Sequence, residues 1–396
     1  MKKIVAFLLI IALPCFGALS EKGPIVFIVG TRPEAIKTIP TYEAVKALGL
    51  PAVLLSTGQH KELLNEMFSL FNVKPDYDLE IMKPGQDLFY VTEAVLRGAR
   101  KLFEEIKPSL VVVQGDTTSA MSASLAAFYL KIPVAHIEAG LRTGNVYAPF
   151  PEEINRMFIT RIAALNFAPT QLAVDHLKEE NVKESSIFLT GNTVVDALYA
   201  IKDKIKKNEI TPSSHISLLV SSLKEQNKKI ILLTSHRREN FGKNLFKIFS
   251  AVKKSIQENE NLYFVYPMHP NPNIKKTFDE VFTKDEKQIV LLSPLPYPDL
   301  SFLLDAADGV MTDSGGIQEE AISLNKMTLI LRNETDRPEG LSETARLVGS
   351  DKDQIKKGIQ NIVQNKQNKQ NSRKSPYGDG FASQRIAKII QNFYQE

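Results

Sequence analysis

The stretch "VMTDSGGIQEE" (Val310–Glu320) predicts a buried strand, a tight corner and the start of a helix. Paired glycines cost backbone entropy, so this corner needs either a very tight turn or the close approach of another group. Ser314, Gly315 and Gly316 would offer backbone N–H groups to a phosphate, and the Glu320 carboxylate lies one turn further along the same helix face, where it would suit ribose hydroxyls. A capped helix whose glycines only permit tight packing explains these residues equally well.

Strand-and-helix units of this kind are predicted along the whole chain. The expected strands are residues 24–29, 52–57, 110–114, 133–137, 165–169 and 186–190, then 229–235, 262–267, 288–292, 308–312 and 327–331. They are apolar without alternation, which is typical of parallel strands covered on both faces. The prediction is an α/β protein with two Rossmann-like domains facing a central cleft, where the carboxyl ends of both sheets meet.

At 396 residues the chain exceeds the usual size of one hydrophobic core, which favours two domains. The N-terminal domain is predicted at 23–195 and the C-terminal domain at 229–378, with a linker inside the polar, lysine-rich region 196–228. Residues 379–396 carry apolar side chains on one helical face and are expected to form a helix that docks on the rest of the protein.

The first 20 residues differ from the rest, because two lysines precede an uncharged apolar stretch that ends in small residues. This pattern is typical of a secretory signal, and a wrongly assigned start or an uncleaved anchor would also explain it. The only cysteine, Cys15, lies within this leader, so a mature chain would hold no disulfide. The net charge of +4 is small for the length and does not indicate a nucleic-acid partner. The dispersed histidines indicate neither a metal site nor a cofactor.

The segment "GTRPEAIK" follows the first predicted strand. Thr31 and Glu34 have the spacing of a capping box, which marks a helix start. Arg32 and Lys37 add two cations near that helix N-terminus, where cations gain nothing from the helix dipole. We therefore favour an anion site at this corner.

Three acidic residues follow strands or their loops in the N-terminal half: Asp116, Glu138 and Glu152. A single such carboxylate is usually a helix cap or a surface group. Three that converge on one cleft would supply the acid and base groups for proton transfer at carbon. In the C-terminal half, His236 directly follows a strand and suits a phosphate or sugar contact, although a partly exposed structural histidine is the alternative.

Several linked motifs extend from about Ile25 to the C-terminus: "GTRPEAIK", "GDTTS", "HIEAGLRTG", "PEEINR", "GNTVVDAL", "SHRREN", "TDSGGIQEEA", "RPEG" and "PYGDG". Their order and spacing resemble those of the bacterial non-hydrolysing UDP-N-acetylglucosamine 2-epimerases. The resemblance implies a fold of the glycosyltransferase-B type and the role usual in that family, which is to supply precursors of envelope polysaccharides. It further implies interconversion of UDP-GlcNAc and UDP-ManNAc through a 2-acetamidoglucal intermediate, without metal or nicotinamide, in a homodimer.

The resemblance also implies roles for residues of this sequence. The catalytic candidates are Asp116, Glu138, Glu152 and His236. The substrate-binding candidates are Arg32, Lys37, Ser314, Gly315, Gly316, Glu320 and Arg337. A second UDP-GlcNAc, acting as a regulator, would lie near Gln59, Arg237, Arg238 and His269. Glu62 replaces a glutamine that is frequent in the family, and Leu295 and Leu300 replace more polar or aromatic residues near the expected uracil pocket.

Other functions are compatible with parts of this pattern. A hydrolysing epimerase would release ManNAc and UDP, and a related group acts on 2,3-diacetamido uronic acid sugars. A UDP-sugar glycosyltransferase would use the same glycine corner but needs an acceptor rather than three carboxylates, and a nucleotide-sugar sensor needs no acid–base groups. The expected location is the cytoplasm, where UDP-GlcNAc is made, in conflict with the signal-like leader.

Overall fold

The computed structural model describes residues 22–283, 285–364 and 375–396. The predicted leader, with Cys15, lies outside these residues. Within the described ranges, none of the helices combines the length and the apolar character needed to cross a membrane.

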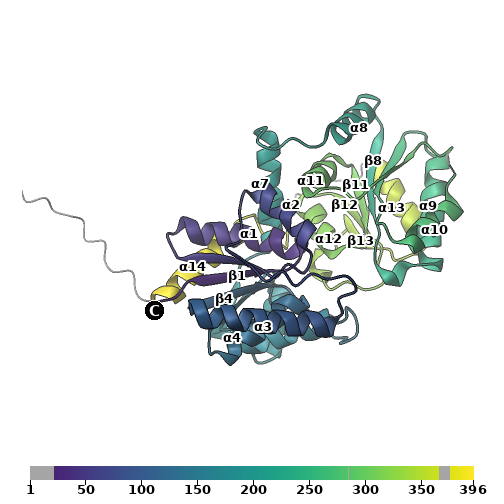
Figure 1. Cartoon of the computed structure of the whole chain (residues 1–396). Coiled ribbons are helices and arrows are strands. Elements are labelled where there is room, and N and C mark those ends of the chain that lie inside the picture. Colours follow the sequence, from purple (N-terminus) through teal and green to yellow (C-terminus); the bar gives the residue numbers. More distant parts are fainter. Residues whose placement is uncertain (1–21, 284, 365–374) are drawn as a thin grey trace, which may run out of the picture.

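Two parallel sheets form within the described chain (Figure 1). The first has the order β3-β2-β1-β4-β5-β6-β7 and the second the order β10-β9-β8-β11-β12-β13. Their strands are β1 (Ile25–Val29), β2 (Ala52–Ser56), β3 (Tyr77–Asp78), β4 (Leu110–Gln114), β5 (Val134–Ile137), β6 (Leu165–Ala168), β7 (Ile187–Leu189), β8 (Lys229–Thr234), β9 (Leu262–Pro267), β10 (Ile289–Leu292), β11 (Gly309–Thr312), β12 (Met327–Ile330) and β13 (Ala345–Leu347). The predicted α/β fold with two Rossmann-like domains is confirmed, and only β3 and β13 were not predicted.

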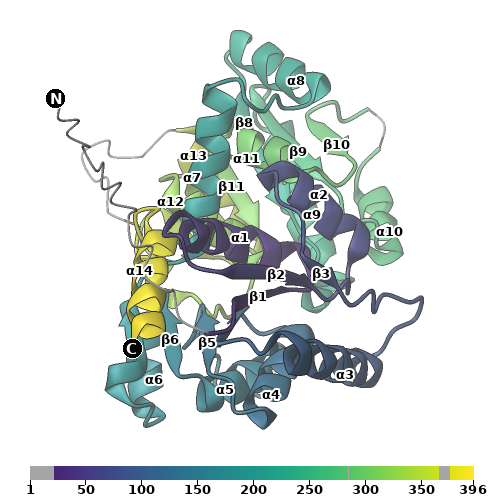
Figure 2. The same cartoon turned by 60° about the vertical axis from the view of Figure 1, so that its left-hand side comes forward.

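Each sheet is covered by helices on both faces, which explains the continuous apolar runs in its strands. In β1, Ile25, Phe27 and Val29 face one core and Val26 and Ile28 face the other. Helices α1 (Arg32–Ala47), α2 (Lys61–Phe71) and α7 (Thr193–Lys206) contribute to the first core, and α3 (Leu88–Ile106), α4 (Thr118–Tyr129) and α5 (Glu152–Ile162) to the second. Figure 2 shows α3, α4 and α5 on the opposite side of β1 from α1, with α6 (Gln171–Glu179) at the same end.

The second sheet is built in the same way. Ile231 and Leu233 of β8 face a core that includes α9 (Lys243–Gln257), α10 (Pro272–Val281) and α13 (Lys352–Val363). Ile230 and Leu232 face the opposite core, with α8 (Ser214–Glu225), α11 (Tyr297–Ala306) and α12 (Gly315–Ser323). The central strands of both sheets are therefore buried on both faces.

The region predicted to contain the linker, 196–228, is largely helical, because α7 and α8 occupy it. The last helix, α14 (Ala382–Gln395), returns to the N-terminal half and packs against α1, as Figures 1 and 2 both show. Asp196 of α7 holds the start of α14 in place by accepting hydrogen bonds from the backbone N–H groups of Ala382 (3.2 Å) and Ser383 (2.7 Å).

The helix start predicted from the spacing of Thr31 and Glu34 is confirmed, since α1 begins at Arg32, but the Thr31 side chain does not complete a capping box. Thr31 is the N-cap residue, but its side chain makes no capping hydrogen bond within the described structure. Glu34 instead accepts hydrogen bonds from the backbone N–H of Gly30 (3.1 Å) and the hydroxyl of Thr117 (2.8 Å). Its carboxylate therefore joins the first strand-to-helix turn to the loop that follows β4, and burial raises its pKa to about 7.

Candidate active site

Glu138 follows β5 at the carboxyl end of the first sheet. It has a φ of 65°, a left-handed conformation that is uncommon for a non-glycine residue and often marks a functional position. Its Oε2 accepts a hydrogen bond from Lys37 Nζ at 2.5 Å and another from the Gln114 side chain. Burial alone would raise the pKa of Glu138, but the cations of Lys37 and Arg337 hold it below its usual value. Glu138 is therefore kept ionised.

Asp116 follows the neighbouring strand β4, and its pKa is shifted in the opposite direction from that of Glu138. Its Oδ2 lies 3.2 Å from Arg156 Nε, and its side chain remains 30% exposed. Burial raises the pKa of Asp116 to about 6, Arg156 opposes this rise, and the charges of Glu138 and Glu152 add to it. Two carboxyl groups whose pKa values are pushed apart at one site can divide the roles of acid and base.

Glu152, the third predicted carboxylate, is the first residue of α5 and is half-buried. It acts on Asp116 through its negative charge, which raises the pKa of Asp116. All three acidic residues predicted to converge thus belong to one electrostatic group at the end of the first sheet.

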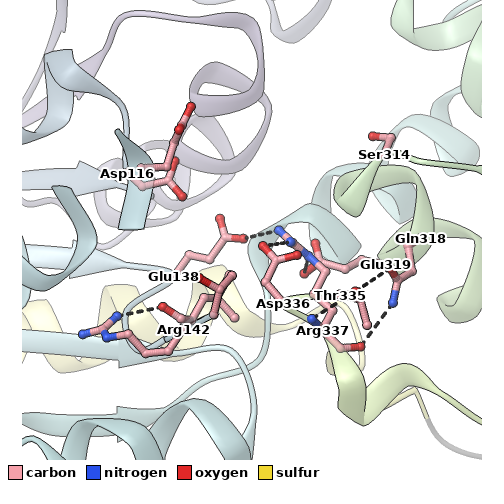
Figure 3. A network of polar contacts seen from close by, with 12 residues as sticks. Asp116, Glu138, Arg142, Ser314, Gln318, Glu319, Thr335, Asp336 and Arg337 are labelled. Atoms are coloured by element: carbon pink, nitrogen blue, oxygen red, sulfur yellow. Dashed lines mark hydrogen bonds and ion pairs between the residues drawn. The ribbon is translucent and has the colours of Figure 1, made fainter. Parts of the chain in front are cut away.

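Arg337 reaches this group from the C-terminal half (Figure 3). Its guanidinium lies 2.7 Å from Glu319 Oε1, 2.5 Å from Asp336 Oδ2 and 3.4 Å from Glu138 Oε1. Because the first two carboxylates orient the guanidinium, its remaining nitrogen points toward Glu138. We call Asp116, Glu138, Glu319, Asp336 and Arg337, together with the side chains they contact, the interdomain site.

Glu319 was not predicted, although it is fully buried and also accepts a hydrogen bond from Asn192 Nδ2 at 3.1 Å. The only signal in the sequence is that it precedes Glu320 in the "QEE" motif. The sequence analysis assigned Glu320 of this pair to ribose, whereas the structure shows that Glu319 orients Arg337.

The glycine corner adjoins the same arginine. Ser314 caps α12 by accepting a hydrogen bond from the backbone N–H of Ile317. A Cβ atom on Gly315 would lie 2.5 Å from Arg337 Nη1, whereas one on Gly316 would have no described atom within 4 Å. The close approach expected at these glycines is therefore made at Gly315 by the Arg337 guanidinium, and Gly316 faces open space.

These two glycines give a matched pair of substitutions. We expect Gly315→Ala to lower the free energy of unfolding by about 1–3 kcal/mol, because three carboxylates prevent the guanidinium from moving aside. Gly316→Ala should leave it unchanged or raise it by up to about 1 kcal/mol, because alanine is favoured over glycine in a helix and meets no neighbour here. Urea unfolding of both variants checks this, and equal losses would contradict it.

Glu320 lies on α12 beside Arg32 of the other half. The Tyr297 hydroxyl donates a hydrogen bond to Glu320 Oε1 at 2.6 Å, and burial raises the pKa of Glu320 to about 7. Arg32 Nη2 donates to the backbone oxygen of Leu295 at 3.3 Å. Arg32 and Lys37, predicted as one anion site, thus diverge: Arg32 faces the C-terminal half and Lys37 is paired with Glu138.

His236 lies at the end of β8, on a loop held by the buried Asp313. The Asp313 carboxylate accepts hydrogen bonds from the backbone N–H groups of His236 (3.0 Å) and Arg237 (3.1 Å) and from Asn240 Nδ2 (2.9 Å). The sequence did not indicate this role for Asp313. The His236 ring is 44% exposed and stacks on His269, with ring centres 6.2 Å apart.

The other regulator candidates lie on both halves. Arg237 donates to the Asp313 carbonyl oxygen at 3.0 Å, and Arg238 is exposed. Gln59 belongs to the N-terminal half, where its side-chain oxygen accepts a hydrogen bond from Ser119 at 2.8 Å. Leu295 and Leu300, near the expected uracil pocket, pack into the core beneath α11.

Arg142 follows Glu138 in sequence but points away from the interdomain site (Figure 3). Its Nε lies 2.6 Å from Glu180 Oε1, so this pair stabilises the loop rather than the site. No group of three histidine, cysteine, aspartate or glutamate side chains among the described residues is placed to hold a metal ion.

The two Rossmann-like domains, each a parallel sheet covered by helices on both faces, place the protein in the class of two-domain α/β folds of the glycosyltransferase-B type. A family model described as UDP-N-acetylglucosamine 2-epimerase matches residues 43–391. The chain belongs to this family of UDP-N-acetylglucosamine 2-epimerases.

Individual relatives agree with this assignment. The UDP-N-acetylglucosamine 2-epimerase of Bacillus subtilis is 41% identical over 378 residues, which cover 94% of this chain and 96% of the relative. The crystal structure of UDP-GlcNAc 2-epimerase from Neisseria meningitidis bound to UDP-GlcNAc is 37% identical, covers 93% of this chain and 100% of that chain, and has a TM-score of 0.85. A glycosyltransferase from Rickettsia africae, 13% identical with a TM-score of 0.59, shares the fold alone.

Proposed function

We propose that the interdomain site interconverts UDP-GlcNAc and UDP-ManNAc by epimerisation at C2 of the sugar. The observation that carries this proposal is the pair Glu138 and Asp116. Glu138 is held ionised and lies 3.4 Å from Arg337 of the other half, and Asp116 has a pKa of about 6. Family membership and the Neisseria meningitidis relative bound to UDP-GlcNAc support the substrate.

The reaction proceeds by elimination and re-addition of UDP. A carboxylate removes the proton from C2, the electrons of the C2–H bond form the C1=C2 double bond, and the C1–O bond to UDP breaks. The products of this step are 2-acetamidoglucal and UDP. In the second step a phosphate oxygen of UDP bonds again to C1 while a carboxyl group delivers a proton to the other face of C2. No redox partner is required.

Each side chain has a role in this scheme. Asp116, Glu138 and Glu152 exchange the protons, and Lys37 keeps Glu138 ionised. The departing diphosphate carries negative charge, which Arg32, Arg337 and the N–H groups at Ser314, Gly315 and Gly316 would stabilise. His236 lies at the adjoining loop as a further contact, and Glu320 binds the ribose hydroxyls.

Incubation of the protein without its leader, with UDP-GlcNAc alone in deuterated water, tests the proposal by proton NMR. UDP-ManNAc with deuterium at C2 is the expected product. Free ManNAc with UDP would indicate a hydrolysing epimerase instead. Turnover that requires an added sugar acceptor would indicate a glycosyltransferase.

UDP affinity should depend on the protonation of Glu320. Because the ionised carboxylate accepts hydrogen bonds from ribose, we expect affinity to rise as the pH increases through about 7. The Tyr297 hydroxyl lowers the pKa of Glu320, so Tyr297→Phe should move this rise to higher pH. Calorimetric titration with UDP between pH 5.5 and 8.5 measures both curves.

Tyr266→Phe is the matched control for that experiment. Tyr266 is also buried in the C-terminal half, but its hydroxyl finds no hydrogen-bond partner within the described structure. Removal of the Tyr266 hydroxyl should leave the pH dependence of UDP binding as it is in the wild type. A curve that moves equally in both variants would show that Tyr297 does not act through Glu320.

We also propose a second UDP-GlcNAc site, as a regulator, near Gln59, Arg237, Arg238 and His269. Its support is the family resemblance together with the stacking of His269 on His236. Sigmoidal dependence of rate on UDP-GlcNAc, lost in His269→Ala, is the expected result. The homodimer is a further proposal, which sedimentation of the purified protein tests directly.

We propose the cytoplasm as the location, because UDP-GlcNAc is a cytoplasmic metabolite. N-terminal sequencing of the native protein from separated cell fractions tests this. A periplasmic form that begins near Ala18 or Glu21 would overturn it.

A further inference from the structure

Arg156 of α5 is buried at the junction of the two halves, with only 2% of its side chain exposed. Its Nε lies 3.2 Å from Asp116 Oδ2, in its own half, and its Nη1 lies 3.7 Å from Asp336 Oδ2, in the other half. Glu153 Oε2 is also near, 3.8 Å from Nε. One buried cation is thus shared between a predicted catalytic carboxylate and a carboxylate across the junction.

Asp336 is itself surrounded by arginines. Its Oδ1 lies 2.9 Å from Arg332 Nη1, and its Oδ2 lies 2.5 Å from Arg337 Nη1 and 3.7 Å from Arg156 Nη1. Only 5% of its side chain is exposed, so solvent screens these charges weakly. Ion pairs therefore cross the junction in both directions. Arg337 of the C-terminal half lies near Glu138 of the N-terminal half, and Arg156 of the N-terminal half lies near Asp336 of the C-terminal half.

We propose that Asp336 is a positioning residue for the epimerisation, which shares Arg156 with Asp116 and so sets how readily Asp116 takes up and releases a proton. This inference rests on the proposed function, because it takes Asp116 as one of the proton-exchanging groups. Since Asp336 belongs to the C-terminal half, the sharing exists only while the two halves are in contact.

The direction of the effect follows from the charges that face Asp116. Arg156 of α5 and Lys37 of α1 favour its ionised form, and Glu138 after β5 and Glu152 of α5 oppose it. Removing the negative charge of Asp336 leaves Arg156 to act only on the carboxylates of its own half, Asp116 and Glu153, which lowers the pKa of Asp116. Removing Arg332 should raise the pKa of Asp116. The Asp336 carboxylate then has one cation fewer beside it, so it attracts Arg156 more strongly and weakens the effect of Arg156 on Asp116.

The experiment follows the pH dependence of kcat/KM for UDP-GlcNAc, together with deuterium exchange at C2, from pH 5 to 9. In the wild type one limb of the profile should lie near pH 6, where Asp116 titrates. Asp336→Asn should move that limb to lower pH by about half a unit or more, and Arg332→Gln should move it to higher pH. Asp336→Glu, which restores the charge, should return the limb toward the wild-type position.

Opposite shifts from two neighbouring substitutions distinguish this role from a merely structural one, which would lower the rate without moving the limb. Asp308→Asn is the matched control, because Asp308 is also ion-paired in the C-terminal half, 2.8 Å from Lys229, and remote from Arg156. It should leave the profile unmoved. Should Asp336→Asn fail to fold, the upward shift in Arg332→Gln decides the matter alone.

The outcomes also separate this inference from the proposed function. A wild type that neither epimerises nor exchanges the C2 proton would overturn the proposed function and this inference with it. If the wild type is active, and the limb of its kcat/KM profile lies at the same pH as in Asp336→Asn and Arg332→Gln, only the role of Asp336 would be overturned.

Discussion

Glu138→Gln should reduce epimerisation by about 10³-fold or more while the protein remains folded. The amide cannot accept the C2 proton, and it no longer matches the cations of Lys37 and Arg337 that keep Glu138 ionised. Exchange of the C2 proton with deuterated water should be lost to the same extent. UDP binding should persist, because the glycine corner and Glu320 lie on the other half.

The control for this variant is Glu180→Gln. Glu180 also pairs with an arginine of the loop after β5, since its Oε1 lies 2.6 Å from Arg142 Nε, but that pair faces away from the interdomain site. Its activity should stay within about twofold of the wild type, as for most substitutions outside special sites. Proton exchange that survives in Glu138→Gln would remove Glu138 from the chemistry.

Arg337→Ala should have the largest effect on stability, lowering the free energy of unfolding by about 3–5 kcal/mol. Its loss leaves Glu319, Asp336 and Glu138 buried without their shared cation. Turnover should also be abolished, because the same guanidinium is the proposed partner of the departing diphosphate. Urea unfolding and the NMR assay measure the two effects separately.

This loss of stability should depend on pH in a defined direction. Burial already raises the pKa of Glu319, and loss of Arg337 raises it further above that of the unfolded chain; the pKa of Glu138 also rises, although Lys37 still lowers it. The folded state then binds more protons than the unfolded state, so the stability of the variant falls as the pH rises through those values. The difference from wild type should be smaller at pH 5 than at pH 8.

Arg97→Ala provides the comparison for Arg337→Ala. Arg97 pairs with Glu93 on the surface of α3 with 77% of its side chain exposed, so its removal should cost no more than about 0.5 kcal/mol. A loss in Arg337→Ala that is no larger, or that grows on acidification, would contradict the buried-cation account.

The strands of both sheets could be predicted from the sequence because they are buried on two faces and uniformly apolar. Strands β3 and β13 were missed for a physical reason: they are two- and three-residue edge strands without an apolar run. The strand-end rule found Asp116 and Glu138, since parallel strands bring their carboxyl ends to one edge.

What the sequence could not show is which partner each buried polar side chain contacts. Arg32 and Lys37 are five residues apart, yet one reaches Leu295 and the other Glu138. Likewise Glu319 and Glu320 are neighbours on α12 with different partners, Arg337 and Tyr297. Such contacts depend on how elements that are distant in the sequence pack together, and in the case of Arg32 on how the two domains meet, which has no local pattern in the chain.

The return of α14 to the N-terminal half has a consequence for how the chain folds as it is synthesised. Ile386 and Ile390 cover the core formed by β1 and α1, near the beginning of the chain. Because α14 follows the whole C-terminal half in sequence, that apolar face remains uncovered while the C-terminal half is being made. The N-terminal half therefore reaches its final core only after α14 has been synthesised, and a chain truncated before Ala382 would leave the face exposed.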